Sequence, residues 1–137
     1  MITAFSQKDK RWSGLKIAGN LTIGKYGCFI TCLSMLDGRT PDVVLKILKA
    51  DGALTSQGLL ISKKAADSLG FIYKGVTSWR PRIPCIAETH DFKKFGFAQH
   101  FFVWLGNGLI IDSLDGKTKT LPYKVASYRL FFKGDVA

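Results

Sequence analysis

The longest mainly apolar run of the chain lies at 28–36, in the sequence CFITCLSML. Only a Thr and a Ser interrupt its hydrophobic character, so nearly every face of a helix formed here would be apolar. A pattern of this kind predicts a buried helix. Asp37 and Gly38 follow at once and favour its end, and Gly27 precedes it, where a turn must deliver the chain into the first helical position.

Two further helices are predicted downstream of this run. Thr40 can cap a helix that has Pro41 in its first turn, and the segment continues as an apolar stripe until Gly52. A third helix fits 57–69, with Gly70 after it. By contrast, residues 1–27 are rich in Gly, Lys and Ser. We expect them to be mostly irregular, anchored in the core by Trp12.

The second half of the chain changes to short runs rich in β-branched and aromatic residues, bounded by Gly, Pro and Asp. These predict strands at 71–76, 84–89, 100–106, 108–113 and 128–133. The Asn107-Gly108 pair between two apolar runs indicates a tight hairpin. A chain in which helices come first and an antiparallel sheet follows is typical of the α+β class. We therefore predict one α+β domain over residues 1–137, with N-terminal helices packed on the sheet.

Composition supports a folded globule. Of the 137 residues, 47% are hydrophobic and 22% are charged, which argues against intrinsic disorder. We expect no membrane span, because no segment reaches the ~18 uncharged apolar residues that one needs. The first residues, MITAFSQKDKRW, contain no apolar signal core. We therefore expect a protein that is cytoplasmic at synthesis, with release to the cell wall only through a partner.

The net charge of +10 favours an anionic partner such as nucleic acid, a cell-wall polymer or an acidic peptide. However, the basic residues are scattered, and Asp9 interrupts the densest cluster of Lys8, Lys10 and Arg11. A solvated basic surface and a specific polyanion site both fit this pattern, and a nucleic-acid partner is not favoured.

The three cysteines are predicted to be free thiols, since Cys28 and Cys32 lie one helical turn apart and Cys85 has no companion. A thiol attacks as a thiolate, which the N-terminus of a helix stabilises. Cys28 alone stands at such a position, whereas Cys32 should face the core. The alternative for Cys28 is a buried small hydrophobic residue.

A nucleophilic cysteine needs a base, an acid that orients the base, and an oxyanion donor. His100 opens a predicted strand and is the better base, while His90 lies in a polar loop and is expected to be a surface residue. Asp112 ends the partner strand of the hairpin, so it should approach His100. It could equally cap the turn that follows. Gln7 is the candidate oxyanion donor, although alone it would be an ordinary surface glutamine.

In this order, FSQKDKRW, YGCFITCLSML, QHFFVWLG and IIDSLDG resemble the papain-like cysteine peptidases of the double-glycine leader-peptidase (C39-like) type. The resemblance is greatest to their stand-alone bacterial and phage branch. It implies a papain-like fold, with Cys28 as nucleophile, His100 as base, Asp112 as orienting acid and Gln7 in the oxyanion hole. Phe29 and Ser113 depart from the Gly and Pro that many relatives carry after the Cys and the Asp.

The resemblance implies a cysteine hydrolase that cleaves a peptide or peptide-like amide, with no cofactor or metal. A phage or bacterial peptidoglycan endopeptidase and an intracellular protease both fit. A second class is a catalytically silent domain of the same fold that binds a host protein or nucleic acid. A third is a zinc site built from the three cysteines and a histidine, for which only the Cys28–Cys32 spacing is tolerable.

Overall fold

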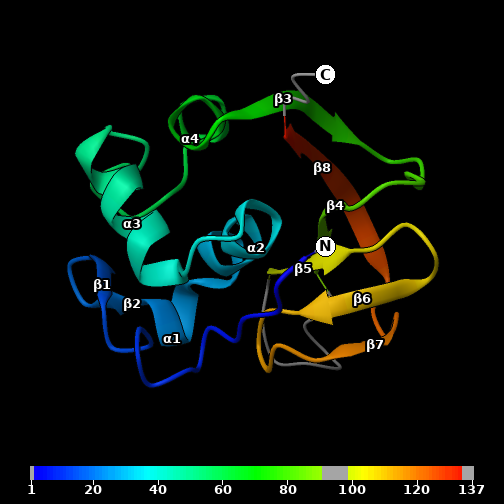
Figure 1. The fold of residues 1–137 in the computed structure, drawn as a ribbon, viewed down its shortest axis with the longest axis horizontal. Helices are drawn as coiled ribbons and strands as arrows, with labels where there is room; N and C mark the ends of the chain where they lie inside the picture. Colours follow the sequence, from blue (N-terminus) through cyan, green and yellow to red (C-terminus); the bar gives the residue numbers. More distant parts are fainter. Residues whose placement is uncertain (1, 91–98, 134–137) are drawn as a thin grey trace.

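The computed structural model describes residues 2–90 and 99–133, which form an α+β structure (Figure 1). The helices are α1 (Ile23–Tyr26), α2 (Cys28–Asp37), α3 (Pro41–Ala50) and α4 (Ser62–Leu69). The strands are β1 (Lys16–Ala18), β2 (Leu21–Thr22), β3 (Phe71–Thr77), β4 (Cys85–Thr89), β5 (His100–Trp104), β6 (Leu109–Asp112), β7 (Thr118–Thr120) and β8 (Val125–Lys133). No helix in these two ranges is long and apolar enough to cross a membrane.

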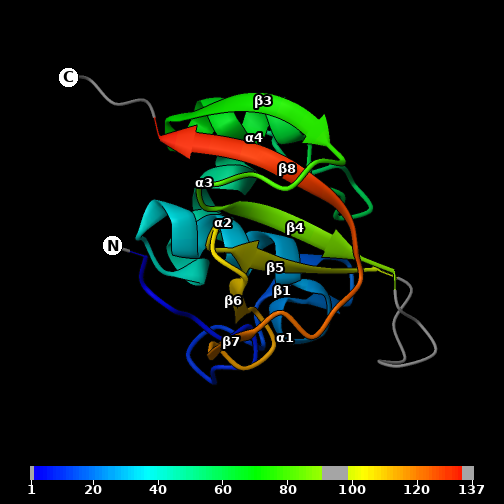
Figure 2. The ribbon, with the colours of Figure 1, turned by 90° about the vertical axis from the view of Figure 1, so that its right-hand side faces the viewer.

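Six strands form one antiparallel sheet in the order β3-β8-β4-β5-β6-β7, while β1 and β2 pair separately. The helices gather on one side of this sheet, and α2 packs against β4 and β5 near its middle (Figures 1 and 2). The predicted arrangement of N-terminal helices on an antiparallel sheet is therefore confirmed at the level of the α+β class.

Both faces of the central strand β5 are buried, which explains its nearly continuous apolar sequence. Phe101 and Val103 belong to the core between sheet and helices. Phe102 and Trp104 point the opposite way, into a second core that Tyr123 and other residues of the β7–β8 region cover. The first residue of this strand is thus held between two packed layers.

The apolar run at 28–36 does form a buried helix. α2 has Gly27 as its N-cap and ends at Gly38, which adopts a left-handed conformation (φ 98°) and donates its N–H to the Ser34 carbonyl at 2.7 Å. Cys32 is fully buried in the core, as predicted. Two of the helix's first residues, Cys28 and Phe29, are only partly buried and border open space.

The sequence placed the third helix too early. It begins at Ser62 rather than at 57, because the preceding residues form a small loop closed by a bridge between Leu54 and Leu60. Gly58 in this loop has φ 79°, and the Thr55 hydroxyl accepts the Leu59 N–H at 3.0 Å. These turn interactions compete successfully with helix formation.

Residues 1–27 are more regular than predicted, since they contain β1, β2 and α1. Such short elements carry little periodicity and depend on tertiary packing. Trp12 does anchor the segment, being 2% exposed and donating its indole N–H to the Ser6 carbonyl at 2.8 Å. The sequence also missed β7 and the first three residues of β8.

The hairpin predicted at Asn107-Gly108 is present, but its turn is longer than two residues. β5 ends at Trp104 and β6 begins at Leu109. Gly106 and Gly108 both have left-handed φ values, and a Cβ on Gly106 would lie 2.4 Å from the Arg82 carbonyl oxygen. The connection therefore needs two glycines. It sets a register in which Phe102 faces Asp112.

Candidate active site

Cys28 is the first residue of α2, where backbone N–H groups are not used by the helix itself. Its side chain is partly exposed, whereas Cys32 and Cys85 are both fully buried. Burial raises the pKa of Cys32 well above its ordinary value and raises that of Cys85 to about 12. Of the three thiols, Cys28 is thus the accessible one.

Gly27 permits this placement of Cys28. A Cβ at Gly27 would lie 2.6 Å from the Ile23 carbonyl oxygen and 2.7 Å from the Ile23 Cα. Both are backbone atoms that cannot move without displacing α1. The glycine before the cysteine is therefore required by the close approach of α1 to the start of α2.

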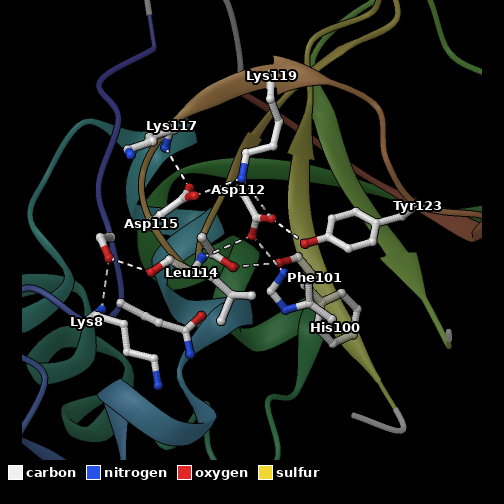
Figure 3. Close-up of polar contacts among 12 residues, drawn as sticks. Lys8, His100, Phe101, Asp112, Leu114, Asp115, Lys117, Lys119 and Tyr123 are labelled. Atoms are coloured by element: carbon white, nitrogen blue, oxygen red, sulfur yellow. Dashed lines mark hydrogen bonds and ion pairs between the residues drawn. The ribbon is translucent and has the colours of Figure 1, made fainter. Parts of the chain in front are cut away.

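His100 and Asp112 meet across the β5–β6 hairpin, as the sequence predicted (Figure 3). Nε2 of His100 lies 2.8 Å from Oδ1 of Asp112, and the two side chains are 3% and 2% exposed. The pair is diagonal, because Asp112 stands directly opposite Phe102, two residues along from His100. The remaining imidazole nitrogen is Nδ1, and Cys28 lies close enough to the ring to help raise the pKa of His100.

The second carboxylate oxygen of Asp112 has partners that sequence reasoning missed. The buried Tyr123 hydroxyl donates to Oδ2, and Lys119 Nζ lies 3.6 Å from the same atom (Figure 3). The rings of Tyr123 and His100 are also in edge contact, with centroids 5.5 Å apart. The only signal in the sequence was the need of a buried Asp for more than one partner.

Asp112 also fills the turn-capping role that the sequence left open. Its Oδ1 accepts the Leu114 N–H at 3.0 Å, and its backbone carbonyl accepts the Gly116 N–H at 2.7 Å. The two alternatives for Asp112 are therefore compatible, since one carboxylate both caps the turn and binds the imidazole.

The electrostatics of this pair favour the charged forms. Burial alone would lower the pKa of His100, but the hydrogen bond to Asp112 and the interaction with Cys28 outweigh burial and raise the pKa to about 9. Burial would raise the pKa of Asp112, but hydrogen bonds from His100, Tyr123 and the Leu114 N–H lower it to about 2. An imidazolium held by a carboxylate is thus the stable state of the pair at neutral pH.

Gln7 is not a surface residue: it is 2% exposed and lies between the two halves of the site. Its backbone N–H donates to the Ser113 carbonyl at 2.7 Å, next to Asp112 in the chain. Its Nε2 donates to the Gly24 carbonyl at 3.1 Å, one helical turn before Cys28. Its Oε1 is buried without a hydrogen-bond partner among residues 2–90 and 99–133.

Cys28 and Phe29 open onto a groove of about 640 Å³. It is lined by residues of α1 and α2, by the segment around Leu59, by the start of β5 and by Arg129 of β8. Its walls are mainly aliphatic and aromatic. The rings of Phe29 and Phe101 are 4.5 Å apart, and this contact ties the first turn of α2 to the strand that begins with His100. A ligand in the groove would therefore lie against the Cys28 side chain.

The remaining expectations concern His90 and zinc. His90 is exposed, with its Nε2 3.0 Å from Glu88 Oε2, so its placement agrees with a surface histidine. Within the described part of the chain, no three His, Cys, Asp or Glu side chains are grouped so as to hold a metal ion. Cys85 faces the second core rather than Cys28. The zinc alternative therefore gains no support from these residues.

No protein-family model, curated protein or solved structure matches the chain. The geometry around Cys28, His100 and Asp112 is therefore the basis for a functional proposal.

Proposed function

We propose that the protein is a papain-like cysteine hydrolase that cleaves a peptide or peptide-like amide bond. The observation that carries this proposal is the buried pair of His100 and Asp112, whose imidazole also interacts with a partly exposed cysteine at the start of a helix. A nucleophile, a base and an orienting acid gathered at one site are the parts that covalent amide hydrolysis needs.

In the proposed mechanism the proton of Cys28 resides on His100, and the thiolate attacks the amide carbonyl carbon. His100 then donates this proton to the nitrogen of the leaving amine, and the C–N bond breaks to leave a thioester. Water, deprotonated by His100, attacks the thioester and releases the acid and the Cys28 thiolate. Throughout, Asp112 holds the ring by Nε2 and stabilises its positive charge.

The oxyanion that forms in each step needs hydrogen-bond donors. The backbone N–H of Cys28 at the start of α2 is one candidate. Gln7 is the other: one proton of its amide nitrogen binds the Gly24 carbonyl, and the amide carries a second proton. The position of Gln7 between Gly24 and Ser113 supports this role, because those two residues flank the segments that carry Cys28 and Asp112.

The first test is the selective reactivity of Cys28. Purified protein is treated with iodoacetamide at neutral pH, and alkylation of each cysteine is followed by peptide mass spectrometry. Cys28 should react at least ~100 times faster than Cys32 and Cys85, which are internal controls because they are buried. His100→Gln should slow the reaction of Cys28. Equal rates for folded and denatured protein would contradict the proposal.

The second test addresses the bond that is cleaved. Purified bacterial cell walls and a library of unstructured peptides are incubated with the wild-type protein and with Cys28→Ala, and new amino groups are counted. Release from cell walls would support a peptidoglycan endopeptidase, while release from the peptides would support a protease. A Cys28→Ala protein that retains full turnover would rule out both.

A further inference from the structure

The charged side chains that line the groove beside Cys28 share one sign. Among the described residues that line it, the charged ones are Lys25 and Arg129, and none is acidic. Lys25 is exposed on α1, and Arg129 comes from β8. Two basic side chains therefore line a groove that is otherwise mainly apolar, and Glu88, which pairs with Arg129, is not among the lining residues. Such a site attracts an anionic group better than a neutral one, because its apolar walls reduce solvent screening.

Arg129 is held rigidly in this wall. Its guanidinium carbon lies 4.8 Å from the ring centroid of Phe101 and 5.7 Å from that of Phe29, so the cation sits over the aromatic surface next to Cys28. Its Nη1 donates to Glu88 Oε1 at 2.8 Å, and its side chain is 20% exposed. A fixed, partly desolvated guanidinium loses little entropy when it binds a ligand.

Glu88 does not exhaust the hydrogen-bonding capacity of Arg129. Besides the guanidinium, the carboxylate accepts from Ser127, Gln99 and His90, so its charge is shared among four donors. Burial would raise the pKa of Glu88, but these bonds lower it to about 2. On Arg129, the described residues provide a hydrogen-bond partner for Nη1 only. A guanidinium has five N–H donors in a planar fork and can bind a second carboxylate.

We propose that Arg129 is a specificity-determining residue, and that the peptide in the groove carries apolar side chains together with a carboxylate that binds Arg129. Lys25, the other basic residue of the groove lining, strengthens the same preference. This inference rests on the proposed hydrolase function, because it names the class of substrate that reaches Cys28: an acidic, apolar peptide.

The test uses acetylated tetra-leucine chloromethyl ketones in which one leucine at a time is replaced by Glu or by Gln. The Cys28 sulfur displaces chloride and forms a thioether with the probe, and the second-order rate of labelling is measured by mass spectrometry. At one position or more, the Glu probe should react about threefold to tenfold faster than its Gln partner. Arg129→Gln should abolish this preference, and Lys25→Gln should reduce it.

Lys64→Gln is the matched control, since it removes one positive charge from the exposed face of α4 and should keep the preference. Because Arg129→Gln leaves buried Glu88 without its cation, the double variant Glu88→Gln/Arg129→Gln provides a second route to a folded protein. It should also lack the preference.

The outcomes separate the two proposals. Fast labelling of Cys28 with no advantage of Glu over Gln at any position would overturn the role of Arg129 and leave the nucleophile standing. An advantage that survives in both Arg129 variants would do the same. Labelling of Cys28 no faster than in denatured protein would overturn the hydrolase itself, and the substrate class with it.

Discussion

Nε2 of His100 lies 2.8 Å from Oδ1 of Asp112, and both side chains are almost completely buried. Because an imidazole has only two nitrogens, this contact leaves Nδ1 as the nitrogen that can interact with Cys28. Figure 3 shows that Asp112 is itself held by Tyr123 and by the Leu114 backbone. The ring orientation therefore depends on a chain of contacts, and each of them can be tested.

Asp112→Asn should lower kcat by about 10²–10⁴-fold with little change in KM, because an amide cannot stabilise the imidazolium and can bind the wrong tautomer. Hydrolysis rates measured with the best substrate from the release assays would check this. Asp115→Asn is the matched control: it lies three residues away, is exposed, and contacts Lys119 rather than His100. A full-rate Asp112→Asn protein would contradict the orienting role.

Because His100 is charged at neutral pH, the free energy of unfolding and the rate of hydrolysis should both fall at alkaline pH. The pKa of His100 is raised to about 9 from an ordinary 6.5, so its contribution of about 3 kcal/mol is complete below pH 6.5 and is lost as pH rises through 9. Urea unfolding at pH 6, 8 and 10 should show this loss in the wild-type protein and in His90→Gln, but not in His100→Gln. Hydrolysis should decline over the same alkaline range, because neutral His100 cannot protonate the leaving amine.

Tyr123→Phe should make the protein less stable in acid. The Tyr123 hydroxyl helps to lower the pKa of Asp112 to about 2. The ionised carboxylate therefore adds to the free energy of unfolding above its ordinary pKa of 3.8, and this contribution is lost as the pH falls through 2. Without the hydroxyl this loss should begin at higher pH, and stability at neutral pH should fall by about 1–3 kcal/mol. Tyr73→Phe is the control, since no hydrogen bond of its hydroxyl is found in the described ranges. Identical acid unfolding of the two variants would argue against the contact.

Gly27→Ala should reduce the alkylation rate of Cys28 and destabilise the protein by about 2 kcal/mol or more, because the new methyl group meets the backbone of Ile23 at 2.6 Å. Iodoacetamide labelling and thermal unfolding are the measurements. Gly14→Ala is the matched control, because a Cβ there has nothing within 4 Å and the residue does not have positive φ. If both variants behave alike, the tight approach of α1 to α2 is not what sets the cysteine.

Gln7→Ala should lower kcat by about 10²–10³-fold while it leaves the rate of Cys28 alkylation unchanged. The substitution should affect the two reactions differently, because an oxyanion forms during amide hydrolysis but not during alkylation by iodoacetamide. Loss of both rates together would show that the Gln7 side chain only supports the fold, through its hydrogen bond to the Gly24 carbonyl.

The sequence alone determined the features that depend on neighbours in the chain. The apolar run after Gly27 specified a buried helix with Cys28 at its start. The turn glycines between two apolar runs specified the hairpin that brings His100 to Asp112. In both cases the signal is a local periodicity or turn preference, which a short stretch of residues carries by itself.

Only the tertiary structure decided which residues from distant parts of the chain contact the helix start and the hairpin. Tyr123 reaches Asp112, Gln7 lies between Gly24 and Ser113, and Arg129 stands over Phe101 because the β7–β8 region, the N-terminal segment and α2 pack against the same hairpin. These contacts leave no periodic trace in the sequence. They depend on how the faces of separate elements fit together, and close packing settles that only when the whole core has formed.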